Sequence, residues 1–123
     1  MQLLILFIGE NERFDQNQLV DIAKNVPGVE NIREGKFVGS ILEFEFSEGE
    51  DFTTVRLSDD RETISISGLG NASLKIAFSI QKRYPQQITA VDSDYSFELI
   101  LDQINSLEQL RQKILESSYQ TVN

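Results

Sequence analysis

The sequence predicts a single α+β domain, with a largely antiparallel or mixed sheet of five to seven strands and two or three helices packed against one face. Three observations support this class. Some segments alternate apolar and polar residues, whereas others repeat apolar residues at helical spacing. The two kinds of segment do not alternate as in a parallel, doubly wound sheet. The 123 residues, 40% of them hydrophobic, suit one core; we expect a domain over 1–117 and a frayed tail over 118–123.

The first expected elements are a strand, a helix and a short strand. Residues 2–8 are almost uniformly apolar, which is typical of a central strand covered on both faces. This run is too short to span a membrane and lacks the basic region of a signal peptide, so we expect a cytoplasmic protein. Residues 15–26 have helical spacing and end at Pro27, and a strand over 29–33 ends at Gly35. The apolar face of the helix comprises Leu19, Ile22, Ala23 and Val26.

Next, strands over 41–46, 52–57 and 62–67 form an antiparallel meander with one wet face. Polar and acidic turns separate them, over 47–51 and at 59–60. In the first strand Leu42, Phe44 and Phe46 share one face, and Ile41, Glu43 and Glu45 share the other.

The remaining elements are a helix over 72–84, strands over 88–91 and 95–101, and a last helix. Ser106 opens that helix in a capping box, in which its side chain accepts from the Gln109 amide and the Gln109 side chain reaches back. The expected order is therefore strand, helix, three or four strands, helix, two strands, helix.

The chain contains neither cysteine nor histidine. Disulfides, thiolate metal sites, cysteine nucleophiles and histidine-based triads are therefore excluded. Catalysis would have to rest on carboxylates, lysine, tyrosine or a bound metal. We expect no enzyme, no cofactor and no metal site.

A glycine loop separates the third strand of the meander from the following helix. Gly68-Leu69-Gly70 resembles a phosphate-binding loop in its position between a strand and a helix. It lacks the Gly-Lys-Ser/Thr of a P-loop, and Ser73 stands where a dinucleotide fingerprint needs glycine or alanine. The structural interpretation is a turn in which Asn71 caps the helix. A small-ligand or phosphate-binding module using Gly68–Ser73 remains the alternative function.

Two shorter motifs carry weaker hypotheses. Glu34-Gly35-Lys36 matches part of a metal-dependent nuclease site, and the alternative is a charged hairpin turn. Asp92-Ser93-Asp94 could begin a calcium loop, but the required glycine and closing glutamate are absent, which favours a polar turn before Tyr95.

Charge is unevenly distributed along the chain, whose net charge is −9. Residues 43–62 hold eight acidic residues against two arginines, whereas residues 63–91 hold no acid. Such a charge disfavours direct binding of nucleic acid and favours basic partners. The acidic meander has two interpretations: a solvated face protected against edge-to-edge aggregation, or a binding surface for a basic protein.

Size and acidity over the whole chain resemble the immunity proteins of bacterial contact-dependent growth inhibition and related polymorphic toxin systems. Within 67–117, the stretches "SGLGNASLKIAFSIQKRYP" and "AVDSDYSFELIL", followed by the capped helix, are similar to small bacterial proteins of such operons. The resemblance implies that the chain binds and neutralises a cognate toxin. It assigns no individual site residues, because immunity proteins have many unrelated folds.

The leading hypothesis is thus a non-enzymatic immunity protein that binds a toxin, in particular a nuclease, through its acidic surface. Its carboxylates would take the place of phosphates in a basic cleft, with an apolar anchor at the centre. Binding at an exosite is the alternative mechanism, and the oligomeric state is left open. The expected partner-binding residues are Glu43, Glu45, Glu48, Glu50, Asp51, Phe52, Asp59, Asp60 and Tyr95.

Overall fold

The computed structural model describes residues 2–120 and confirms the α+β class and the expected order of elements. Seven strands, three α-helices and one short 3₁₀ helix follow each other within these residues. They are β1 (Leu3–Phe7), α1 (Gln16–Asn25), β2 (Val29–Phe37), β3 (Ser40–Glu48), β4 (Asp51–Ser58), β5 (Ile64–Ser67), α2 (Asn71–Arg83), β6 (Thr89–Asp92), β7 (Glu98–Ile100), η1 (Leu101–Gln103) and α3 (Leu107–Gln120).

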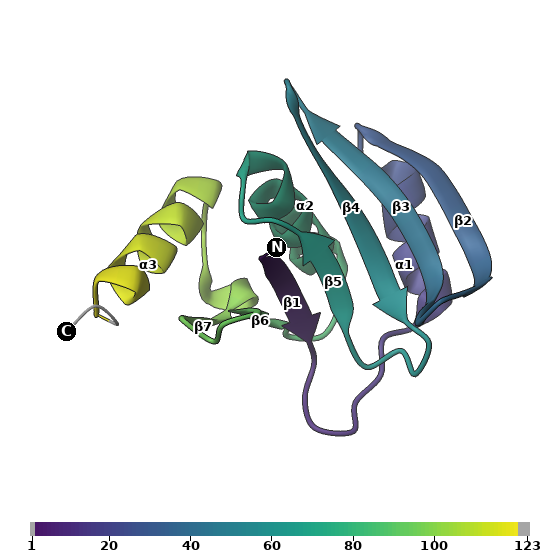
Figure 1. Cartoon of the computed structure of the whole chain (residues 1–123), viewed down its shortest axis with the longest axis horizontal. Coiled ribbons are helices and arrows are strands. Elements are labelled where there is room, and N and C mark those ends of the chain that lie inside the picture. The colour runs from purple at the N-terminus through teal and green to yellow at the C-terminus, as the bar shows by residue number, and fades with distance from the viewer. Residues whose placement is uncertain (1, 121–123) are drawn as a thin grey trace.

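The strands form one antiparallel sheet in the order β2-β3-β4-β5-β1-β6-β7 (Figure 1). The predicted meander is β3-β4-β5. Strand β1 lies between β5 and β6, so its expected central position is confirmed. The sheet runs from the long edge strand β2 to the short edge strand β7.

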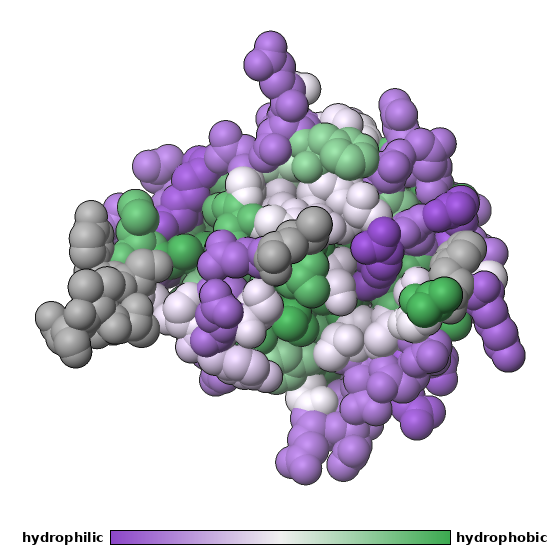
Figure 2. All heavy atoms as spheres, viewed as in Figure 1, coloured by the Kyte–Doolittle hydropathy of each residue, from purple (hydrophilic) through white to green (hydrophobic). Residues whose placement is uncertain are grey.

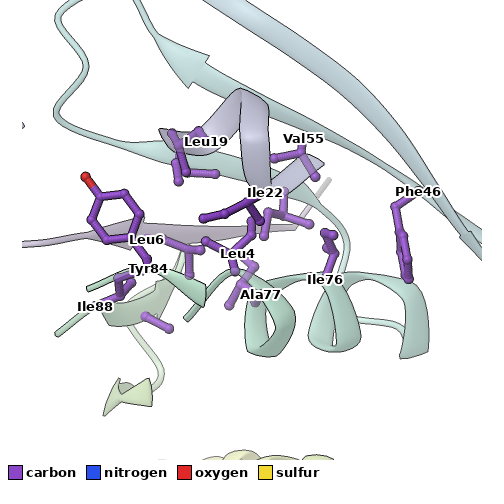
Figure 3. Packing of buried hydrophobic residues seen from close by; sticks show 14 of the residues in the cluster. Leu4, Leu6, Leu19, Ile22, Phe46, Val55, Ile76, Ala77, Tyr84 and Ile88 are labelled. Carbon is purple, nitrogen blue, oxygen red and sulfur yellow. The ribbon is translucent and has the colours of Figure 1, made fainter. Parts of the chain in front are cut away.

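Helices α1 and α2 cover one face of the sheet, here called the inner face, and lie behind it in Figure 1. Leu4 and Leu6 of β1 point into the core between the sheet and these helices. Leu19 and Ile22 of α1 and Ile76 and Ala77 of α2 belong to this same core, as Figure 3 shows. Helix α3 packs beside α2 through the fully buried Leu110 and the half-buried Leu107 and Ile114.

The opposite, outer face of the sheet is not covered by α1 or α2. Burial alternates along the strands: inner-face residues such as Leu4, Phe44 and Ile66 are buried, and Leu3, Ile5 and Phe7 are half-buried. The expectation that the first strand is covered on both faces is therefore wrong for the described chain, because both helices pack on the same side. The predicted wet face of the meander is confirmed, with Glu43 and Glu45 on the outer face.

Several element boundaries differ from the expected ones. Strand β2 continues to Phe37, through two irregularities in its pairing with β3, and does not end at Gly35. The last strand is only Glu98–Ile100, because the Asp92 carboxylate accepts from the Ser96 amide and holds residues 93–96 in a turn. Helix α3 continues to Gln120, beyond the expected end at 117, and residues 121–123 lie outside the described part.

Candidate partner-binding surface

The structure distributes the nine predicted site residues over four places. Glu43 and Glu45 lie on the outer face of β3, and Glu48, Glu50, Asp51 and Phe52 lie at the tip of the β3–β4 hairpin. Asp59 and Asp60 lie in the β4–β5 turn, at the other end of the sheet. The eight residues of β4 separate that turn from the hairpin tip by roughly 25 Å. Tyr95 lies in the β6–β7 turn, across β1 from the hairpin.

Glu43 is neutralised within the chain. Its carboxylate pairs with Arg33 of β2, and Arg56 Nε of β4 lies 2.7 Å from Glu43 Oε1. Both arginines are opposite Glu43 in the strand register. The Arg33 hydrogen bond and, more weakly, that from Arg56 hold the pKa of Glu43 below its usual range despite partial burial. Glu43 therefore links three strands and offers no free negative charge to a partner.

Two acids at the hairpin tip also have internal partners, on helix α2. Lys75 Nζ lies 2.7 Å from Glu48 Oε2. The Asp51 carboxylate accepts from the Ala72 amide at 2.8 Å and from the Phe52 amide at 3.0 Å. These bonds, with Ala72 first, lower the pKa of Asp51. Asp51 thus caps α2 from a distant strand and fixes the hairpin to it.

The expectation that Asn71 caps α2 is wrong. Gly70 is the N-cap residue and has no side chain to offer, while the Asn71 side-chain oxygen accepts from Arg111 of α3. A Cβ at Gly70 would lie 2.7 Å from Asp51 Oδ2. Any larger residue at position 70 would therefore force the Asp51 carboxylate to shift.

The same geometry bears on the alternative phosphate site. The Asp51 carboxylate already occupies the position at the α2 N-terminus where an anion would accept backbone hydrogen bonds. A phosphate at Gly68–Ser73 would have to displace it, so no observation favours this alternative over a turn.

Three predicted residues lie close to one another and are together called the hairpin surface: Glu45, Glu50 and Phe52. Glu50 and Phe52 are exposed, and Glu45 is half-buried. Glu45 accepts a hydrogen bond from the Asn31 side chain on the outer face. Thr54 of β4 is directly opposite Glu45, and Phe52, two residues before Thr54, lies on the same face. Phe52 is 55% exposed. Glu50 occupies the two-residue turn, in which Gly49 has φ +60°, as the first central position of a type II′ turn requires.

The other predicted residues lie away from the hairpin surface. Asp60 accepts from the Ser58 hydroxyl at 2.6 Å and from the Glu62 amide at 2.9 Å, and the Ser58 bond is the main cause of its lowered pKa. Lys36 lines a shallow hollow together with Asp59 and Asp60. These acids are thus part of a mixed-charge turn. Tyr95 is 75% exposed and has φ +55°.

The weaker motifs do not assemble into a site. Glu34 accepts from the Gln16 amide group at 3.0 Å, whereas Lys36 faces the Asp59–Asp60 turn. Asp92 is fully buried and bonded to Ser96, as the polar-turn interpretation requires. Among residues 2–120, no group of three or more acidic residues is arranged to hold a metal ion.

The sequence interpretation missed an apolar stripe on the outer face, next to the hairpin surface. The stripe consists of Leu3, Ile5, Phe7, Val91 and Ile100, which share this face by strand register. None of the five belongs to the core cluster or packs against it. The signal was present in the apolar run at 3–8, but only the position of the helices shows which of its two faces they leave uncovered.

No protein-family model, no curated protein and no solved structure matches this chain. Within the described residues, none of the helices combines the length and apolar character needed to cross a bilayer. The geometry of the described residues therefore carries the functional argument.

Proposed function

We propose that the protein is an immunity protein that binds a cognate bacterial toxin and neutralises it without chemistry of its own. The observation that carries this proposal is the hairpin surface, where an exposed aromatic ring lies between two acidic residues, Glu45 and Glu50. Aromatic side chains held on rigid elements are frequent anchors of protein interfaces. Carboxylates around such an anchor attract a basic partner and orient it.

The structure supports a rigid presentation of this surface. Strand pairing with β4, the Glu48–Lys75 ion pair and the Asp51 bond to α2 all hold the hairpin in place. A surface that is ordered before binding loses less conformational entropy when it meets its partner. Phe52, Glu45 and Glu50 would then enter or border a basic cleft of a nuclease toxin, with the carboxylates in the place of phosphate groups.

The test is co-purification with the protein encoded immediately upstream, expressed as its C-terminal region together with this chain. We expect a stoichiometric complex and protection of cells from the toxicity of that region. Combining Phe52→Ala with Glu50→Lys should weaken the complex about a hundredfold, because the anchor is lost and a like charge faces the partner.

Matched controls lie outside the hairpin surface. Asp59→Lys makes the same kind of charge change in the opposite turn, and Val38→Ser removes an exposed apolar side chain next to it. Both should leave affinity and protection unchanged. Equal loss in the controls and in the hairpin variant would show that net charge alone governs binding. A complex unaffected by the hairpin variant would place the interface elsewhere.

A further inference from the structure

The apolar stripe lies on β1, β6 and β7, toward the β7 edge of the outer face. Ile5 is directly opposite Val91 on β6, and Phe7 and Ile100 share the next row through Thr89. Leu3, Ile5, Phe7 and Ile100 are half-buried by their neighbours within the sheet, and Val91 between them is already fully buried. Figure 2 shows pale and hydrophobic surface in the middle of this view, with hydrophilic side chains on both sides. The stripe is continuous with the hairpin surface across Ser65, Ser67 and Thr54 of β5 and β4.

Strand β1 has apolar residues on both of its faces, as strands that are buried on both faces do. A strand that has one wet face normally alternates apolar and polar residues, as β3 does with Phe44 and Glu45. Strand β1 reads Leu-Leu-Ile-Leu-Phe, with no polar residue on either face. Leu4 and Leu6 account for the inner face, and nothing in the core accounts for the outer three. The outer residues are therefore suited to cover by something outside the described chain.

Charge decides which occupant fits this face. A second copy would bring another net charge of −9 against the first. The border of the stripe includes Glu98, directly opposite Val91 at the β7 edge, and Glu45 and Glu50 lie on the hairpin side. The Arg33 and Arg56 guanidinium groups on this face are engaged with Glu43. A partner with an apolar ridge flanked by lysine or arginine matches this arrangement.

We infer that the basic partner protein covers the outer face of the sheet, with its apolar ridge on Leu3, Ile5, Phe7 and Ile100 and its cations beside Glu98 and the hairpin surface. This inference rests on the proposed function and extends it. The interface then includes strands β1, β6 and β7 as well as one hairpin tip. It also explains why β1 is apolar on the face that this chain leaves open.

The absence of cysteine from the chain allows a direct test by thiol footprinting. Ser65 lies on the outer face between Ile5 and Arg56, and Ser65→Cys introduces a single thiol there with little change in volume. Asn17→Cys places the matched control thiol on exposed α1, on the other side of the sheet. Alkylation by iodoacetamide is followed by mass spectrometry, with and without the C-terminal region of the upstream protein.

We expect the partner to slow alkylation at position 65 about tenfold or more and to leave position 17 unchanged. In a second measurement, Ile5→Thr should weaken the complex about tenfold, and Leu115→Thr, on the exposed side of α3, should not. A melting curve for each variant separates loss of binding from loss of folding.

Other outcomes overturn the inference in distinguishable ways. A complex in which position 65 reacts at its free rate leaves the proposed function intact and removes the outer face from the interface. If alkylation at position 65 is already slow without the partner, and the protein has a dimeric mass in solution, a second copy is the occupant. The absence of any complex overturns the proposed function and this inference together.

Discussion

Among single residues, Asp51 holds the hairpin to the rest of the fold. Its carboxylate joins β4 to the first turn of α2, and its neighbour Phe52 belongs to the hairpin surface. Any substitution at Asp51 therefore changes how the hairpin is held as well as its charge. We therefore expect Asp51 and Glu48 to support the hairpin. The partner would contact Glu45, Glu50 and Phe52.

Asp51→Asn should alter the dependence of stability on pH. The pKa of Asp51 is lowered from its ordinary value of 3.8 in the folded state, so its contribution is present above that value and is lost as pH falls through the lowered pKa. We expect the variant to melt below the wild type at about pH 7, and the two melting temperatures to converge as the pH falls through the lowered pKa. Thermal melts across this range measure it, with Asp59→Asn as the control.

Gly70→Ala should destabilise the protein through Asp51. The added Cβ would lie 2.7 Å from Asp51 Oδ2 and would push the carboxylate away from the α2 N-terminus. We expect a lower urea midpoint for Gly70→Ala in the wild-type background and a much smaller decrease in an Asp51→Ala background. Equal decreases in both backgrounds would show that Gly70 matters for the backbone and not for this contact.

The partners of the acidic residues explain why the site could be predicted only in part. Exposure of Glu50 and Phe52 follows from turn chemistry and alternation, which a sequence shows. Lys75 lies 27 positions from Glu48, and Ala72 lies 21 positions from Asp51. No local pattern encodes these pairings, because they depend on where α2 packs. The sequence segment therefore contains more acidic residues than the folded protein leaves available to a partner.

At the scale of elements, periodicity predicted all three helices and the order of helices and strands along the chain, but not the order of strands in the sheet. Boundaries failed where the backbone is irregular. Asn31 has φ +56° within β2, and the pairing register shifts on either side of Arg33–Glu34. Those irregularities break the alternation that marks a strand. Before β7, the hydrogen bonds from Ser96 to the Asp92 carboxylate hold a turn. Residue propensities do not predict these bonds.

Tyr84 connects the end of α2 to the start of α1. Its ring packs edge-on against Phe14 at 5.5 Å, and its hydroxyl accepts from the Asp15 amide at 2.8 Å. Tyr84→Phe keeps the ring contact and leaves that amide without its protein acceptor, so we expect a loss of about 1 kcal/mol in the free energy of unfolding. Urea denaturation measures it. Tyr95→Phe alters an exposed ring and should change nothing.

At the scale of the whole molecule, folding mixes the charges that the sequence separates. Lys75 comes from the acid-free segment 63–91 and pairs with Glu48 of the acidic segment. Arg33 and Arg56 neutralise Glu43 on the outer face of β2, β3 and β4. The net charge of −9 thus acts on a partner at long range, while contact affinity depends on the few groups that remain exposed.

This separation predicts distinct kinetic effects in the proposed complex. Glu50→Lys changes a charge at the rim of the interface, so it should lower the association rate and flatten its decrease with salt. Phe52→Ala removes buried contact area, so it should leave association nearly unchanged and raise the dissociation rate about tenfold, equivalent to about 1.4 kcal/mol. Surface plasmon resonance at several salt concentrations resolves both rates. If Phe52→Ala acted only on association, the ring would guide encounter without entering the interface, and the anchoring role assigned to it would be wrong.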